Sequence, residues 1–389
     1  MQCLIDDALI REEFPESSNA TWFNTGIVGV MPKSAVEVLA DAIMRFGTGM
    51  FYTHPEIDSA IRTLRERLAS LISAESPTDI CFTRNATEGI TIGISNIDFQ
   101  PGDEIVTSNQ EHGALMNPLN YIHRTGRTKL KTFEVFGDPG ETLQSVKDQI
   151  NSKTKLMASS HVSCQTGIRL PVKEMCEIAR GVGAYVLIDG AQSVGNIAVN
   201  VKDYDCDFYV GNGHKWLCGP KGTSFLYVNP NSTIEPSPTF AALGSFSDDP
   251  AKRRSALRFE YGTRDGMLLI GLLAVLDLYA KWNWQQKAGR IKELSTYLKE
   301  KLRAVPRCVI HTPEDWDRSS GNTTISMEGY SLGEVGEYLS KDWCIMTRGV
   351  PELNAVRIST NYFNTYGEID KLIEALKALH KKQELGAKS

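Results

Sequence analysis

The sequence lacks the features that mark exported and membrane-spanning proteins. Its longest apolar run, Met267 to Leu276, has ten residues, whereas about 20 are needed to cross a bilayer. The first residues, MQCLIDDALIREEF, hold three acids before residue 13 and no charged-then-apolar signal pattern. We therefore expect a cytoplasmic protein that is neither exported nor inserted in a membrane.

Basic clusters and regularly spaced cysteines are also scarce. The chain has 42 Lys and Arg against 47 Asp and Glu, a net charge of −5, and its one basic run is Lys252–Arg254. This balance gives no electrostatic footprint for nucleic acid. The eight cysteines form no C-x-x-C pair, and no histidine has zinc-site spacing, so we expect neither a disulfide framework nor a metal. The 389 residues are enough for the core of an enzyme.

Helical and strand patterns alternate along the chain. Apolar residues recur with the helical period after Pro55 and from Pro171 to Ala179, and Thr365-x-x-Glu368 is a capping box before a final helix. Short apolar runs between helices predict strands at Ile80–Phe82, Glu104–Thr107, Leu156–Ala158, Tyr185–Ile188 and Asp207–Val210. Runs buried on both faces and alternating with helices favour parallel strands in a doubly wound α/β sheet.

The pattern changes near Asp265. From there to about Leu302 it predicts one long helix, followed by β-like segments at Thr323–Ser326 and Ala355–Ser359. We expect a large domain built on a mostly parallel sheet and a smaller C-terminal α+β domain, with the boundary inside the long helix. The predicted division is an N-terminal segment at 1–20, a large domain at 21–275 and a small domain at 276–389.

Two predicted strands end in residues that can carry chemistry. VLIDGAQSVG ends a strand in Asp189 with Gln192 close behind, and DFYVGNGHKW leads a strand into His214 and Lys215. Ligands bind beyond the carboxyl ends of strands in open α/β sheets, so Asp189 is expected to face a crevice. A lysine at such a position has a lowered pKa and can form a Schiff base. The alternatives are a helix-capping aspartate and a surface lysine; GNGHK is not a P-loop.

Two further turns lie earlier in the chain. Asn85 precedes a predicted helix start at Ala86 and Thr87, where free N–H groups and the helix dipole suit a phosphate. His112 follows a predicted strand, and an imidazole there can stack on a ring or carry protons. An ordinary helix cap and a satisfied loop histidine are the alternatives. Taken in order, phosphate turn, histidine, aspartate and lysine indicate a site for pyridoxal 5′-phosphate (PLP).

From Thr21-Trp-Phe-Asn-Thr-Gly to the final helix, the sequence resembles the class V aminotransferases of fold type I. The pair D-G-A-Q and G-H-K carries the resemblance. This family includes cysteine desulfurases, cysteine and cystine C–S lyases, and isopenicillin N epimerase. The cofactor contacts that the resemblance implies are a Schiff base at Lys215, Asp189 at the pyridine nitrogen, Gln192 at the ring 3-oxygen, His112 stacked on the ring, and Ala86, Thr87 and His214 at the phosphate.

The resemblance also implies a partner and a substrate clamp. The family's G-T motif is Gly262-Thr263 here, which would place Thr263 at the phosphate of the other subunit in a homodimer with shared active sites. Arg357 matches the arginine that grips the substrate α-carboxylate, and a planar guanidinium suits that task. A structural ion pair is the alternative for Arg357. Asn24 is also expected to line the substrate site.

The sequence departs from the desulfurase pattern at two places. Persulfide-forming desulfurases carry a nucleophilic cysteine on a loop before the carboxylate arginine, but residues 345–356 contain none. Cys344, just before them, is expected to be a packed strand residue. Where many desulfurases have asparagine after H-V-S, this chain has Cys164 and Gln165, and Gln165 is expected to take over the cofactor-side hydrogen bond and to lie at the substrate site.

These departures favour one reaction. We predict a PLP-dependent lyase that carries out β-elimination on cysteine, cystine or a cysteine conjugate, through the external aldimine and quinonoid that the family implies. An epimerase resembling isopenicillin N epimerase and a class V aminotransferase are the alternatives. A desulfurase that uses an enzyme cysteine, or a non-catalytic protein with a PLP fold, is less favoured.

Overall fold

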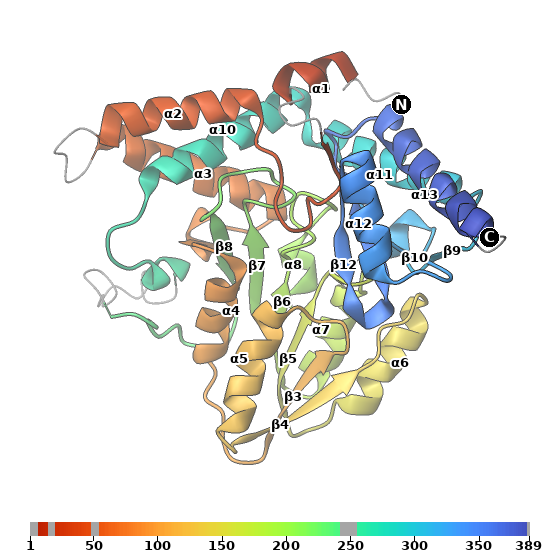
Figure 1. Ribbon diagram of the computed structural model, residues 1–389. Helices are drawn as coiled ribbons and strands as arrows, with labels where there is room; N and C mark the ends of the chain where they lie inside the picture. Colours follow the sequence, from red (N-terminus) through yellow and green to blue (C-terminus); the bar gives the residue numbers. More distant parts are fainter. Residues whose placement is uncertain (1–6, 15–19, 48–53, 242–254, 387–389) are drawn as a thin grey trace.

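The computed structural model describes residues 7–14, 20–47, 54–241 and 255–386, so the basic run Lys252–Arg254 lies outside the described residues. The described chain forms a seven-stranded sheet, a four-stranded sheet and a two-stranded pairing. Helices flank the large sheet, and the C-terminal elements gather on one side of it (Figure 1). This arrangement confirms the predicted fold class, a mostly parallel sheet with a smaller C-terminal domain.

The large sheet has the strand order β2-β8-β7-β6-β5-β3-β4. Its strands are β2 (Ile80–Thr83), β3 (Asp103–Ser108), β4 (Thr128–Phe133), β5 (Thr154–Ser160), β6 (Tyr185–Asp189), β7 (Phe208–Asn212) and β8 (Ser224–Val228). β8 pairs antiparallel with both β2 and β7, and the other pairs are parallel. Five of these strands were predicted from the sequence, whereas β4 and β8 were not.

Side chains that alternate along the strands give the sheet two apolar faces. On β6, Val186 and Ile188 belong to one core together with Met175 of α7 (Val172–Gly181). Leu187, between them, belongs to a second core on the opposite face, together with helix α4 (Ala86–Ser95). Both faces of the sheet are therefore withdrawn from water, which explains the nearly continuous apolar runs in the sequence.

Twelve labelled α-helices lie in the described residues. The remaining ones are α1 (Asp7–Glu13), α2 (Lys33–Gly47), α3 (Pro55–Ile72), α5 (Gly113–Arg124), α6 (Pro139–Gln149), α8 (Val201–Tyr204), α10 (Gly266–Trp282), α11 (Trp284–Leu302), α12 (Leu332–Trp343) and α13 (Tyr366–Gly386). Short 3₁₀ turns occupy Pro77–Asp79, Ala256–Phe259, Trp316–Arg318 and Pro351–Leu353. The predicted helix starts at Pro55 and Ala86 agree with the structure.

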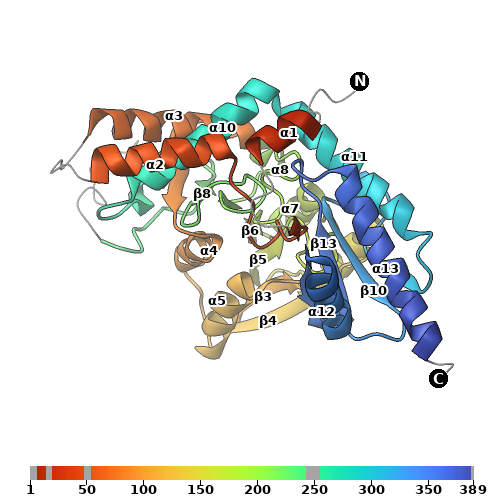
Figure 2. The same cartoon turned by 45° about the horizontal axis from the view of Figure 1, so that its top comes forward.

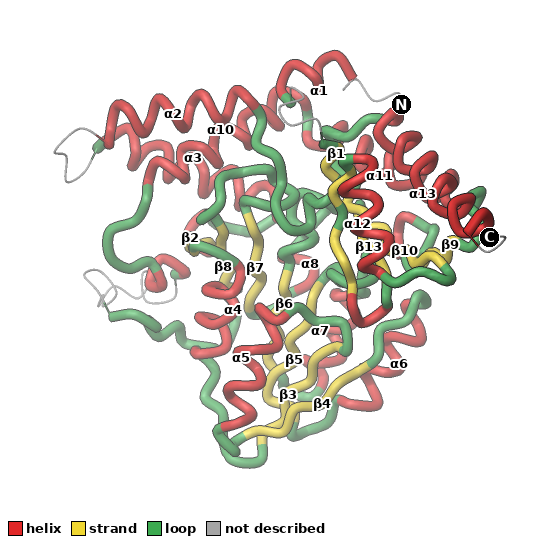
Figure 3. The backbone as a smooth tube through the Cα atoms, in the orientation of Figure 1, coloured by secondary structure: helices red, strands yellow, loops and turns green. Residues whose placement is uncertain are grey.

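The C-terminal part is built on an antiparallel sheet with the order β12-β13-β10-β9. Its strands are β9 (Cys308–Ile310), β10 (Asn322–Met327), β12 (Arg348–Val350) and β13 (Ala355–Ser359). The two-stranded pairing joins β1 (Thr21–Trp22) in parallel to β11 (Ile345–Met346), so residues near the start of the chain lie beside the C-terminal elements (Figure 3). The fold thus brings an N-terminal segment to the small sheet.

The predicted single helix from Asp265 to Leu302 is wrong. The structure has two helices, α10 and α11, which meet at Asn283 with a bend of 86°. Asn283 has a positive φ of 66° and its side chain caps α11, so the helical hydrogen-bond ladder stops there. α10 packs on α2 and α3, whereas α11 turns toward the small sheet (Figure 2). No described helix alone is long and apolar enough to cross a bilayer; α10 and α11 pass that test of length and composition only as a bent pair.

Lys287, near the start of α11, connects the bend between α10 and α11 to the large domain. Its side chain is fully buried, and Nζ donates hydrogen bonds to the carbonyl oxygens of Gly195 at 2.6 Å and Trp216 at 3.0 Å. The ammonium group also lies over three aromatic rings, 4.6 to 4.9 Å from their centroids: Tyr279, Trp284 and Tyr362. Burial nevertheless lowers the pKa of Lys287 to about 7.

We expect Lys287→Met to change the pH dependence of thermal stability. The pKa of Lys287 is depressed in the folded state, so folding releases a proton between about pH 7 and the ordinary lysine pKa of about 10.4. In that window the unfolded chain binds more protons, and this residue's contribution to stability rises with pH. The Tm of the wild type minus the Tm of the variant should therefore become more positive from about pH 6.5 to about pH 9. The exposed Lys281→Met is the control, and a pH-independent difference would contradict the assignment.

Candidate active site

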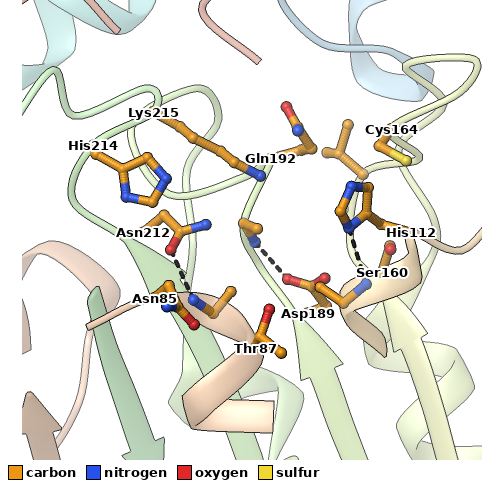
Figure 4. Close-up of a pocket in the computed structure, with 14 residues that line it drawn as sticks. Asn85, Thr87, His112, Ser160, Cys164, Asp189, Gln192, Asn212, His214 and Lys215 are labelled. Atoms are coloured by element: carbon orange, nitrogen blue, oxygen red, sulfur yellow. Dashed lines mark hydrogen bonds between the residues drawn. The ribbon is translucent and has the colours of Figure 1, made fainter. Parts of the chain in front are cut away.

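The carboxyl ends of the parallel strands line a cavity of about 180 Å³ (Figure 4). β5 brings Ser160 to it, β6 brings Asp189 and β7 brings Asn212. Seven of the predicted cofactor contacts line this cavity: Ala86, Thr87, His112, Asp189, Gln192, His214 and Lys215. Strands that run in the same direction and end at one edge are what bring these distant residues together.

Asp189 and Lys215 face this cavity from neighbouring strand ends. Asp189 is 4% exposed, and its Oδ1 accepts a hydrogen bond from the amide of Ala191 at 2.9 Å. Burial raises the pKa of Asp189, and the positive charge of Lys215 opposes that rise. Burial lowers the pKa of Lys215, and the charge of Asp189 opposes that fall. The site therefore has an amine that can reach its neutral, nucleophilic form beside a carboxyl suited to a cationic N–H group.

The start of α4 forms a cradle for an anion. Asn85 caps the helix by accepting the amide of Glu88 at 3.0 Å, and Asn212 Oδ1 accepts the amide of Ala86 at 3.0 Å. Among the described residues, none accepts a hydrogen bond from the amide or the hydroxyl of Thr87, and the ring of His214 lines the same cavity. These donors, with the positive end of the helix dipole, fit a phosphate group.

His112 caps α5, and this contact sets its protonation. Its Nδ1 accepts the amide N–H of Ala114 at 3.0 Å, so the neutral ring carries its proton on Nε2. Burial lowers the pKa of His112, and the charge of Lys215 lowers it further. The preceding Glu111 is buried and accepts hydrogen bonds from the hydroxyl of Ser108 at 2.5 Å and the amide of Ser160 at 2.9 Å. Glu111 thereby joins the ends of β3 and β5 and holds the turn that carries His112.

The N-terminal segment closes the site from the side of the small sheet. Gln192 donates to the carbonyl oxygen of Gly26 at 2.8 Å, and its Oε1 accepts a hydrogen bond from Trp216 Nε1 at 2.9 Å. A Cβ atom added at Gly26 would lie 2.4 Å from Nη2 of Arg357. A larger residue at position 26 would therefore displace the guanidinium of Arg357, which gives a reason for the glycine in the Thr21-Trp-Phe-Asn-Thr-Gly motif.

Arg357 is fully buried and only partly paired. One Nη donates to the carbonyl oxygen of Cys164 at 2.7 Å, while Nε and the second Nη have no hydrogen-bond partner in the described part of the chain. The buried Oδ1 of Asn24 likewise has no partner there. Unpaired buried polar atoms are costly, and a carboxylate would accept bonds from both free guanidinium nitrogens. Arg357 therefore has the surroundings of a ligand-binding arginine, and among the described residues it forms no structural ion pair.

Two expected residues, Thr263 and Gln165, do not line this cavity. Thr263 lines a neighbouring cavity, which shares Asn85 and His214 with this one. Cys164, not Gln165, lines the site, and the Gln165 carbonyl oxygen accepts a hydrogen bond from the Thr324 hydroxyl at 2.6 Å.

The expectation for Cys344 is wrong. It is exposed and caps α12 in the left-handed conformation, with φ of 54°, and β11 begins at the next residue. A helix C-cap of this kind depends on backbone geometry that apolar patterning does not reveal.

Sequence patterns did not find several residues that shape this site. Asn212 lies inside the GNGHK turn, and its amide could have been recognised as a strand-end acceptor. Glu111 and Ser160 come together only through the neighbouring strands β3 and β5. Within the described residues, no group of three or more His, Cys, Asp or Glu is placed to hold a metal.

The sequence matches a known enzyme family along most of its length. The model of the aminotransferase class-V family covers residues 37–372. The chain belongs to this family. It is 30% identical over 343 residues to a cysteine desulfurase of Escherichia coli O127:H6, with 82% of each chain covered. It is 29% identical over 377 residues to isopenicillin N epimerase of Streptomyces clavuligerus, covering 92% of this chain and 94% of the epimerase.

Two solved structures of C-DES are similar to this fold, each at 25% identity over 94% of this chain. One is a C-DES variant with glycine covalently linked to its PLP cofactor, with a TM-score of 0.86 over 98% of that chain. The other is the cystine C–S lyase C-DES with its product cysteine persulfide, with a TM-score of 0.85 over 99% of that chain. PLP is thus the cofactor expected for this family, and the relatives include a desulfurase, an epimerase and a lyase.

The side chains present fit PLP at the cavity. Thr87 and the start of α4 would hold the phosphate, and Asp189 would pair with the ring nitrogen. Lys215 would offer the amine for the aldehyde carbon.

We expect Arg357→Lys to weaken binding of α-carboxylate ligands without removing the cofactor. A point-like ammonium cannot reproduce the two-pronged contact, so the Kd for L-alanine should rise about 10- to 100-fold. Spectral titration of the PLP-loaded protein measures this Kd, and alkaline release measures PLP content. Alaninamide lacks the carboxylate and serves as the matched ligand. Equal losses for PLP, alanine and alaninamide would show that Arg357 is structural.

Proposed function

We propose that this protein is a PLP-dependent lyase that breaks the C–S bond of cysteine, cystine or a cysteine conjugate by β-elimination. The bound cofactor supplies an electron sink for charge that develops at the substrate α-carbon. Lys215, with its lowered pKa, supplies a neutral amine that removes the α-proton. Arg357 orients the α-carboxylate through its free Nε and Nη groups.

The observation that most supports elimination is the tautomer of the neutral His112 ring. Because Nδ1 accepts the Ala114 amide, the neutral ring presents an N–H donor at Nε2, and His112 lines the cavity. The leaving sulfur develops negative charge as the C–S bond breaks, and an N–H donor of this kind can stabilise that charge by a hydrogen bond. His112 can stack on the cofactor ring and still make this contact through the ring edge.

The state of the thiols supports a lyase over a persulfide-transferring desulfurase. Burial raises the pKa of Cys164, the cysteine at the cavity, although the charges of Arg357 and Arg348 oppose that rise. A protonated thiol is a poor nucleophile. Cys344 caps a helix, and residues 345–357 hold no cysteine, so this segment carries no thiol to the substrate.

A second candidate is an epimerase. The protonated Cys164 thiol lines the same cavity as Lys215 and can return a proton to the α-carbon in place of the one that Lys215 removes. The similarity to isopenicillin N epimerase points the same way. An aminotransferase has the same first step and stays an alternative.

The quaternary structure belongs to this proposal as well. We propose a homodimer in which Thr263 reaches the phosphate of the partner's site; within one chain, Thr263 lines a cavity next to that chain's own phosphate cradle. The cytoplasmic location expected from the sequence is also part of the proposal.

We expect Lys215→Ala to abolish both the visible absorption band of the bound cofactor and turnover. Without the amine, the protein loses its covalent link to the cofactor and its base, so pyruvate and ammonia release should fall at least about 10³-fold. The exposed Lys221→Ala is the control. A keto acid formed only with an amino acceptor would identify an aminotransferase. Solvent deuterium at the α-carbon with inversion and no breakdown would identify the epimerase.

We expect His112→Asn to slow elimination in proportion to the basicity of the leaving group. Asparagine preserves the helix cap but cannot place an N–H donor where Nε2 of the longer imidazole lies. The kcat for S-methyl-L-cysteine, which expels a basic thiolate, should fall about 10²- to 10³-fold. The kcat for β-chloro-L-alanine, which expels chloride, should fall much less. Equal losses for both substrates would assign His112 to cofactor binding alone.

A further inference from the structure

Three strands of the small sheet place Arg348, Arg357 and Thr324 in one row. Arg357 on β13 pairs directly with Arg348 on β12 and with Thr324 on β10. Residues directly opposite each other in antiparallel strands project from the same face of the sheet. Arg357 donates to the carbonyl oxygen of Cys164, and Thr324 donates to that of Gln165. The row therefore faces the segment that forms one wall of the cavity.

Two positive charges stand side by side in this row. Like charges directly opposite each other destabilise a strand pair, and burial increases the cost. Arg357 is fully buried with two free nitrogens, and Arg348 is half-buried. Within the described ranges, no residue forms a hydrogen bond or an ion pair with the Arg348 side chain. The two guanidinium groups thus repel each other with no protein carboxylate between them.

The nearby acids are engaged elsewhere. Asp189 accepts the Ala191 amide at the end of β6, and its charge acts on Lys215. Glu111 accepts bonds from serine groups at the ends of β3 and β5. The hydrogen bonds of both carboxylates are therefore made at the edge of the large sheet and not with Arg348 or Arg357.

The charge of Arg348 reaches the site. Its positive charge lowers the pKa of His112, Lys215 and Arg357, in each case as a smaller cause than burial. The same charge opposes the rise in the pKa of the Cys164 thiol. A negative group bound near Arg348 would relieve this repulsion.

We propose that Arg348 binds a second anionic group, on the side chain of the amino-acid substrate, and that the enzyme prefers substrates with an acidic side chain. This inference rests on the proposed function, in which Arg357 holds the α-carboxylate. One carboxylate neutralises one guanidinium, so the arginine pair is balanced only when the ligand carries a second negative charge. The Cβ atoms of a directly opposite pair are about 5 Å apart, so a short side chain can bridge the two groups. Cysteine conjugates that end in a carboxylate have this form.

Equilibrium binding tests the proposal without requiring turnover. The ligands are acid and amide pairs of nearly equal shape: S-carboxymethyl-L-cysteine with S-carbamoylmethyl-L-cysteine, and L-glutamate with L-glutamine. Spectral titration of the PLP-loaded protein gives each Kd. We expect wild type to bind each acid about tenfold or more tightly than its amide, because only the acid pairs with Arg348.

Variants then test whether Arg348 is the source of this preference for acids over amides. Arg348→Gln should reduce the acid-to-amide preference to about one, with the loss falling mainly on the acids, whereas Arg348→Lys should retain part of it. Arg303→Gln is the control, because Arg303 is an exposed arginine of the same domain that pairs with Glu314. PLP content is measured for every variant.

Several outcomes would overturn the proposal. If wild type binds acids no better than amides, or if Arg348→Gln weakens both members of a pair equally, Arg348 is not a specificity residue. Equal weakening is also the result expected if Arg348 pairs with a carboxylate of a second copy of the chain. If no amino acid changes the spectrum, the proposed function fails and this inference fails with it. Binding with the acid preference but without pyruvate release would refute elimination alone.

Discussion

Lys215 and Asp189 bring opposite charges out of water at the ends of two neighbouring strands. Each is costly to bury alone, and each partly offsets the burial cost of the other. The parallel register of β6 and β7 places Asp189 opposite Val210, so the turn after β7 that carries Lys215 begins close to the end of β6. The register of the large sheet therefore governs the charge state of the site, because a shift of one residue along β6 would turn Asp189 to the other face, away from Lys215.

The turn that carries Lys215 is held by segments from three distant parts of the chain. Trp216, the next residue, donates through its indole to Gln192, and its carbonyl oxygen accepts a bond from Lys287 of α11. Gly29, from the N-terminal segment, donates its amide to the His214 carbonyl oxygen at 2.8 Å. A reactive amine held in this way keeps one position without making the neighbouring side chains part of the chemistry.

The site could be predicted where its signals are local. Asp189, Lys215 and Thr87 stand at strand ends or helix starts, and a short apolar run followed by a polar turn marks such positions. The bend at Asn283 escaped prediction because a single residue with positive φ interrupts a helix without disturbing the apolar period. Glu111 and Arg348 escaped for another reason. Their partners come from other strands, so their surroundings exist only after the chain has folded.

The pairing of β1 with β11 has a consequence for the order of assembly. Thr21 pairs with Ile345, and Asn24 bridges to Ser359, so the segment that carries Gly26 is placed by residues near the opposite end of the chain. During synthesis, strands β2 to β8 leave the ribosome well before these late partners and can form their sheet first. Contacts between such distant residues are slow to form, because a long loop must close before they are gained. The large sheet can therefore form before the cavity is closed, and the contacts of Gly26 and Arg357 can form only after β13 has emerged.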